Sequence, residues 1–216
     1  MLWWIELLAV MSSGVFGVLL ARRKQLDFVG VFSVAFVVTF GGGTLRDVLL
    51  DRRPLFWIEN DHYVKILFGL SLVASLIRCW PVGWEKWLHF PDALGLGLFS
   101  IAGTSHALMA GTSPFIAALL GVITGTCGGV IGDIVCNEVP HLFRPTAPLY
   151  ATCSFVGVWV FQLLAMAHVH TNVAIWSGVA TTVVMRLVAL RFDLKLPATK
   201  SPEERDADER NRNVSD

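Results

Sequence analysis

The sequence predicts an all-α membrane protein: seven transmembrane helices, as two inverted three-helix repeats plus one, with glycine-kinked second and fifth helices. Composition is the first reason. Of 216 residues, 54% are hydrophobic and only 16% are charged, with a mean hydropathy of +0.61. Soluble domains usually carry about 25% charged residues. The other reasons are the spacing of the apolar segments and a repeat in their polar residues.

A helix needs about 20 mostly apolar residues to cross a bilayer. Seven segments meet this requirement, and polar or proline-containing breaks separate them. The predicted spans are residues 2–21, 27–50, 62–81, 92–110, 114–137, 146–168 and 172–191. The chain is polar from Lys195 onward, which favours a disordered cytoplasmic tail over residues 196–216.

Residues 86 positions apart match without a gap. The matching pairs are Asp47 and Asp133, Pro54 and Pro140, Gly17 and Gly103, Ala21 and Ala107, and, as acids, Glu6 and Asp92. The repeat unit holds three spans, an odd number, so the second copy enters the membrane upside down relative to the first. We therefore expect one repeat over residues 1–81, its inverted copy over 92–168, and a seventh span over 172–195.

Basic residues near the span ends orient the stack, because they concentrate on the cytoplasmic side. An outside N-terminus places ten of them inside: Arg22, Arg23, Lys24, Arg78, Lys86, Arg144, Arg186, Arg191, Lys195 and Lys200. Three then lie outside, namely Arg52, Arg53 and Lys65. We expect a multi-pass protein of the cell (inner) membrane with a cytoplasmic C-terminus. The 17 basic and 17 acidic residues balance, so net charge predicts no nucleic-acid partner.

The two glycine-rich segments, Gly41–Gly43 and Gly128–Gly129, lie inside the second and fifth spans. Each glycine costs a helix about 1 kcal/mol relative to alanine, so consecutive glycines favour an unwound segment. Free backbone groups are tolerated at membrane depth only where protein or water satisfies them. The glycines therefore indicate either a buried path for water and ions or close packing of two helices through small residues.

An unwound segment would create two kinds of helix end. Thr44 would cap a short half-helix with Asp47 in its first turn, and Asp133 would hold the equivalent place in the second copy. Capping would by itself explain both aspartates. The preceding half-helices would end at residues 39–41 and 124–127 with carbonyls of partial negative charge. A cation site of backbone oxygens is expected there, near Thr39 and Gly41 and near Thr124 and Cys127.

Three further polar residues are candidates. Arg46 lies in a span, where a charge must face protein or water. It either pairs with an acid, of which Asp133 across the pseudo-symmetry axis is one, or stands in the path as a gate. His106 is either a packed, hydrogen-bonded histidine or a proton relay. Glu138 lies near the inner end of the fifth span, where it either attracts cations or caps a helix.

The motif GGGTLRD at residues 41–47 and GGVIGD at 128–133, followed by Cys136-Asn137-Glu138-Val139-Pro140, resembles the prokaryotic branch of the trimeric intracellular cation channel family. That branch is also described as carrying paired glycine-transporter-type domains, and the likeness covers about residues 1–195. It implies a homotrimer in the lipid bilayer, with one pore in each protomer lined by the second and fifth helices. It further implies permeation of potassium (K⁺) and other monovalent cations, without enzymatic activity or a cofactor.

Carried over residue by residue, the resemblance places both motifs at the pore. The pore residues are Gly41, Gly42, Gly43, Thr44, Arg46 and Asp47 in the first, and Gly128, Gly129 and Asp133 in the second. On this basis K⁺ would meet the carbonyls near Gly41 and Cys127. The second motif of the family usually has arginine where this chain has Gly132. We expect that difference to give a wider or less gated pore.

Two other functions remain open. Inverted repeats with broken helices also suit a secondary carrier for a small amino acid such as glycine. Two intramembrane aspartates occur in aspartyl proteases too, but the segment before Asp133 lacks the glycine-x-glycine-aspartate spacing of those enzymes. We therefore do not expect an enzyme.

Overall fold

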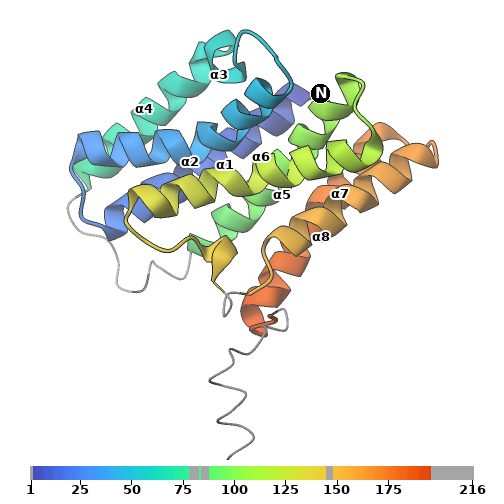
Figure 1. Ribbon diagram of the computed structural model, residues 1–216. Helices are drawn as coiled ribbons and strands as arrows, with labels where there is room; N and C mark the ends of the chain where they lie inside the picture. Colours follow the sequence, from blue (N-terminus) through green and yellow to red (C-terminus); the bar gives the residue numbers. More distant parts are fainter. Residues whose placement is uncertain (1, 78–82, 84–87, 145–147, 196–216) are drawn as a thin grey trace, which may run out of the picture.

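The computed structural model describes residues 2–77, 83, 88–144 and 148–195, and all regular structure in these ranges is helical. Figure 1 shows the elements in chain order. The helices are α1 (Leu2–Arg23), α2 (Phe28–Leu49), α3 (Phe56–Glu59), α4 (Asp61–Leu76), α5 (His89–Met109), α6 (Pro114–Val135), the short 3-10 helix η2 (His141–Phe143), α7 (Ala151–Met166) and α8 (Thr171–Arg191).

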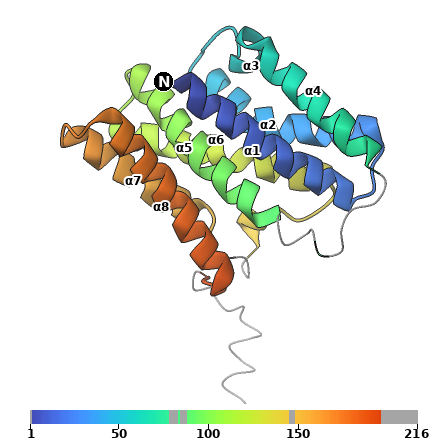
Figure 2. The ribbon, with the colours of Figure 1, turned by 180° about the vertical axis from the view of Figure 1, so that it is seen from behind.

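The long helices form two crossing layers with a flank at each side. α2 and α6 cross on one face of the molecule, and α1 and α5 lie behind them (Figures 1 and 2). α3 and α4 flank this centre on one side, whereas α7 and α8 flank it on the other. α4 packs on α1 and α2, and α7 packs correspondingly on α5 and α6.

Each of the seven predicted spans contains one long helix, and the chain is an all-helical membrane protein. Among the described residues, α1, α2, α6 and α8 are long and apolar enough to cross a bilayer. A full count of seven crossing helices stays a prediction. The sequence did not predict α3 and η2, because each has only three or four residues. The predicted tail and residues 78–81 of the predicted third span lie outside the described ranges.

Helix caps recur at the spacing of 86 residues. Asp27 accepts a hydrogen bond from the backbone N–H of Gly30 at the start of α2, and Ser113 accepts one from Ile116 at the start of α6. After these helices the chain turns through Asp51 and Asn137, both with positive φ. The two halves of the chain therefore begin and end their second helices in the same way.

The expected helix breaks are absent, since α2 and α6 run as unbroken α-helices through both glycine segments. Packing explains these glycines. A Cβ at Gly42 would overlap the carbonyl oxygen of Thr124, and a Cβ at Gly128 would overlap that of Val38. The 86-residue shift exchanges these two contacts, so α2 and α6 meet in a self-complementary way. Of the two interpretations left open, close packing of helices describes the glycines in this structure.

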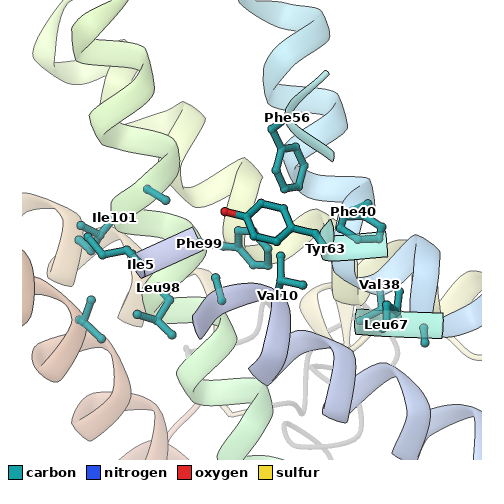
Figure 3. Close-up of a cluster of buried hydrophobic side chains, with 14 of the residues drawn as sticks. Ile5, Val10, Val38, Phe40, Phe56, Tyr63, Leu67, Leu98, Phe99 and Ile101 are labelled. Atoms are coloured by element: carbon teal, nitrogen blue, oxygen red, sulfur yellow. The ribbon is translucent and has the colours of Figure 1, made fainter. Parts of the chain in front are cut away.

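An aromatic cluster fills the space beside this crossing. Phe40, Phe56, Tyr63 and Phe99 are almost fully buried, and they come from α2, α3, α4 and α5 (Figure 3). The rings of Phe56 and Phe99 meet edge to face, with centroids 6.4 Å apart. This geometry is favourable for aromatic pairs. The short helix α3 is thereby anchored to the centre of the molecule.

Candidate functional site

A first group of buried charges lies where α1 begins and α2 and α5 end. Arg46 and Asp47 are both fully buried. Arg46 donates through Nε and Nη2 to Asp47 Oδ1 at 2.9 and 2.7 Å, and its Nη1 lies 3.9 Å from Glu6 Oε1. Its guanidinium also stacks over the Phe56 ring, 5.2 Å from the centroid. A buried guanidinium held in this way is fixed in place, since two acids and a ring surround it.

His106 links this group to the chain after α2. Its Nε2 lies 2.7 Å from Glu6 Oε1, and its Nδ1 lies 3.2 Å from Arg52 Nη1. With the proton on Nε2, the ring donates to Glu6 and accepts from Arg52. Arg52 also donates to Glu59 through Nη2 at 3.1 Å. We call Glu6, Arg46, Asp47, Arg52 and His106 the Glu6 cluster.

A second group lies at the other end of α5. Tyr150 donates its hydroxyl to Asp92 Oδ1 at 3.0 Å, and Arg186 Nη2 lies 3.5 Å from Asp92 Oδ2. Asp133 accepts from the backbone N–H of His141 at 2.9 Å, and His141 Nδ1 is 3.1 Å from the same oxygen. We call Asp92, Asp133, His141, Tyr150 and Arg186 the Asp92 cluster. Asp92 and His106 lie about 20 Å apart along a helix that rises about 1.5 Å per residue.

The Asp92 cluster lines a cavity of about 250 Å³. Its wall also includes Arg23, His89, Gly129 and Val130. A second cavity of about 10 Å³, the size of one water, lies where α2 and α6 cross and is lined by residues that include Ser13, Thr124 and Gly128. The two cavities share Phe16, Asp92, Gly129 and Tyr150 in their walls. They therefore adjoin, and together they lead from one end of the molecule to the helix crossing.

Aromatic rings separate the small cavity from the Glu6 cluster. Phe99 lines the small cavity, and Phe56 packs against Phe99 (Figure 3). Arg46 in turn stacks on Phe56. Thr39 is buried on α2, and its Oγ1 has no hydrogen-bond partner. The rings of Phe99 and Phe56 therefore lie between the small cavity, on the side of Asp92, and the Glu6 cluster.

Several sequence-based predictions need correction. Thr44 lies inside α2, where its Oγ1 accepts a hydrogen bond from Trp57 Nε1 at 3.0 Å, so it caps no half-helix. Arg46 pairs with Asp47 and Glu6, whereas Asp133 binds His141; the suggested pair of Arg46 with Asp133 is wrong. The carbonyls near Gly41 and Cys127 lie within unbroken helices, where each accepts a bond from the residue four positions on.

The remaining candidate residues are glycines of α2 and α6, and Glu138. Gly41 and Gly43 face Ile131 and the Phe56 ring, and Gly129 faces the Tyr150 hydroxyl. Glu138 lies outside the spans, bonded to Lys24 at 2.7 Å, and this hydrogen bond lowers the pKa of its carboxyl group.

The sequence analysis missed four members of these clusters. Arg52 and Arg186 entered it only as charges that orient the spans, and His141 and Tyr150 did not enter it. Arg186 carried a usable signal, because an ionisable residue inside a span is a functional candidate by default. Tyr150 carried none, since only the fold brings it beside Asp92.

The comparisons with known proteins agree with this architecture. The family model described as "Glycine transporter" matches residues 3–78 and 89–166. A membrane protein of Vibrio cholerae is 37% identical over 91% of this chain and 82% of its own, and the inner membrane protein YadS of Escherichia coli K12 is 33% identical over 91% and 95%. A trimeric intracellular cation channel orthologue from Rhodobacter sphaeroides is 31% identical, with a TM-score of 0.81 over 89% of this chain and 98% of that one.

The chain belongs to the prokaryotic trimeric intracellular cation channel family. Membership was expected from the motifs at residues 41–47 and 128–133, and it is confirmed. The family model skips the segment between residues 78 and 89, which joins α4 to α5, and ends at the last residue of α7. α8, which carries Arg186, therefore lies outside the residues that the family model matches.

Proposed function

We propose that this protein is a potassium-permeable monovalent cation channel with one path inside each protomer of a homotrimer. The path begins at the 250 Å³ cavity, passes the small cavity at the crossing of α2 and α6, and reaches the Glu6 cluster. The observation that carries the proposal is this line of adjoining cavities with an acidic residue, Asp92, in the walls of both. Buried carboxylates favour cations over anions in a confined path.

The same path accounts for the polar residues of the two clusters. Charged side chains inside a membrane protein are costly, and they line ion pathways or pair with each other. Here they gather at the two ends of one line, which begins at Asp92 and ends at Glu6. The rings of Phe99 and Phe56 lie between them and act as the closed gate. K⁺ is the proposed main ion, and the family resemblance supports that choice.

The arrangement of the protomer in the membrane is part of the proposal. We infer an inverted repeat of α1, α2 and α4 with α5, α6 and α7, which the 86-residue shift in caps and glycine contacts supports. The basic residues favour an outside N-terminus, so the large cavity would open to the cytoplasm. Solved structures of trimeric channels in the same family support a homotrimer.

Electrical recording tests the function directly. The purified protein in planar bilayers should pass ohmic current in a potassium gradient, and its reversal potential should lie close to the potassium potential. Phe99→Leu removes a ring from the proposed gate and should raise the open probability. A protein that carries no current under these conditions, while it remains trimeric and folded, would contradict the proposal.

A secondary carrier for a small amino acid such as glycine is the second candidate. One observation favours it: a large cavity reaches the interior from the Asp92 end, and the rings of Phe99 and Phe56 lie between it and the Glu6 end, which suits alternating access. The cavity wall offers Arg186 for a carboxylate and Asp92 for an ammonium group. Saturable glycine uptake into proteoliposomes, with no ohmic current with or without glycine, would establish the carrier in place of the channel.

A further inference from the structure

The second half of the chain has Gly132 at the position where the first half has Arg46. The shift of 86 residues relates these two positions, as it relates Asp133 to Asp47. A side chain does not fit at Gly132 in this packing. A Cβ there would overlap Val38 Cγ2 and lie 3.3 Å from Leu20 Cδ2. Valine has a stiff side chain and cannot easily give way. A guanidinium in this half must therefore come from elsewhere.

Arg186 on α8 supplies it. Only 3% of this residue is exposed. Its Nη1 donates to the carbonyls of Pro148 and Leu149 at 3.1 and 2.9 Å, and its Nη2 faces Asp92 Oδ2 at 3.5 Å. Its guanidinium stacks over the Tyr150 ring, 4.6 Å from the centroid. The same arginine lines the large cavity.

The two buried arginines occupy matching surroundings. Arg46 faces Glu6 and stacks on Phe56, while Arg186 faces Asp92 and stacks on Tyr150. Glu6 and Asp92 are themselves equivalent under the 86-residue shift. Glu6 and Asp92, which are equivalent in the repeat, therefore each have a buried guanidinium beside them, although the second guanidinium comes from a helix outside the repeat.

Close packing sets the position of α8. A Cβ at Gly97 of α5 would lie only 3.2 Å from the carbonyl oxygen of Val179, and a Cβ at Gly157 of α7 would overlap Thr182 Oγ1. Both contacts lie within two turns of Arg186 on α8. The helix is therefore held against α5 and α7 without space between them, and this fixes the guanidinium beside Asp92.

We propose that Arg186 determines the charge of the large cavity and thereby limits how strongly the path attracts cations. The inference rests on the proposed channel function. It gives α8 a role in setting the charge of the path, in addition to its packing against α5 and α7. Arg186 offsets the charge of Asp92 in a wall shared by both cavities. Without it, the negative potential at Asp92 would draw in more cations, most strongly at low salt.

The test is single-channel conductance at about 50 mM and about 1 M KCl. R186Q should raise conductance at least about twofold at the lower concentration and much less at the higher, where the Debye length is only about 3 Å. D92N/R186Q restores the original charge balance and should return conductance toward that of the unmodified protein. R191Q makes the same charge change at an exposed position of the same helix, where water and salt screen it, and should change conductance little.

The outcomes separate a charge role from a structural one. A merely structural Arg186 would make R186Q lose conductance equally at both salt concentrations, and D92N/R186Q would lose more; either result overturns the inference. If R186Q does not fold, D92N alone tests the inference. Removal of the Asp92 charge should then lower conductance more at about 50 mM than at about 1 M KCl, and an equal effect at both concentrations overturns the inference. If the unmodified protein carries no current, the channel function itself is overturned. If it carries current and the variants have the same conductance as the unmodified protein, only the role of Arg186 is overturned.

Discussion

Asp47 and Asp133 hold equivalent places in the two halves, but they have different partners. Each accepts a hydrogen bond from the backbone N–H of the residue that begins the next short helix, Phe56 or His141. Asp47 additionally binds the fully buried Arg46, whereas the second partner of Asp133 is the half-exposed His141 side chain. Positions that match in sequence therefore differ in how much of the fold depends on their charge.

This difference predicts unequal effects of the same substitution. Asp47→Asn leaves a buried guanidinium without its main partner, which typically costs about 3–5 kcal/mol. Asp133→Asn removes a charge beside a group that water reaches and should cost about 1 kcal/mol. Thermal unfolding in detergent measures both, each variant being the control for the other. Equal losses of stability would contradict the greater dependence of the fold on the charge of Asp47.

The sequence predicted which polar residues lie together in the interior more accurately than how they pair. Arg46, Asp47, His106 and Asp133 were candidates, and all four lie in the two clusters. The sequence could not predict their partners, because a pair such as His106 and Glu6 joins residues that are 100 positions apart in the chain. A capping motif read from spacing alone placed Thr44 at a helix start that the fold does not contain.

At the scale of elements, the glycines of α2 and α6 allow two backbones to touch. Gly42 faces the Thr124 carbonyl, and Gly128 faces the Val38 carbonyl. Glycine propensity predicted unwinding, but tertiary packing outweighs a cost of about 1 kcal/mol per glycine. Sequence identifies such a site readily, since consecutive glycines are rare in apolar helices. It does not decide between a broken helix and a close crossing, because both need the absence of a side chain.

Added methyl groups at the crossing should therefore force α2 and α6 apart. Gly42→Ala, and more so Gly42→Ala with Gly43→Ala, should cut conductance without abolishing trimers, because overpacking typically costs about 1–3 kcal/mol and displaces the path. Gly69→Ala is the matched control, since a Cβ at Gly69 of α4 meets nothing within 4 Å. Single-channel currents in planar bilayers provide the measurement. Unchanged currents in the double variant would remove the crossing from the path.

The segments that leave α1 and α6 are tied together by charge. Lys24 bonds Glu138 at 2.7 Å, and Arg144 lies 3.5 Å from the same carboxylate. The bond from Lys24 lowers the pKa of Glu138, so the ionised form is favoured in the fold. A carboxylate with a lowered pKa stabilises the fold above its ordinary pKa of about 4.3, and this contribution is lost as the pH falls through the lowered value.

Glu138→Gln should therefore reduce thermal stability at neutral pH, by less than about 1 kcal/mol for a pair near the surface. The difference from the unmodified protein should shrink as the pH falls below the ordinary pKa of about 4.3, because the unfolded chain then takes up the proton first. Unfolding temperatures in detergent between pH 3.5 and 7 give the comparison. A difference that stays constant over this range would show that charge is not the reason.

At the scale of the whole molecule, residues of one protomer form the walls of both the large and the small cavity. Residues of α1, α5 and α6 of a single chain line both cavities, together with Tyr150, which precedes α7. η2 and α8 add residues to the large cavity, and Val38 of α2 lines the small one. The sequence alone could not predict these cavities, because a cavity is a property of side chains from many elements. A pore within each protomer stays an expectation of the family resemblance, and these cavities support it.

Mixed trimers distinguish a path within each protomer from one shared pore. Co-expression of the unmodified chain with Phe99→Leu gives trimers that hold both kinds of protomer, and a tag on one chain allows their purification. Independent paths should open in steps that add, and the protomers that carry Phe99→Leu should open with a higher probability than the unmodified protomers of the same trimer. A shared central pore would open as one unit with one open probability, because all three subunits would then line the same ring. A single open probability in verified mixed trimers would contradict the path from Asp92 to Glu6, since Phe99 acts only inside its own protomer on that path.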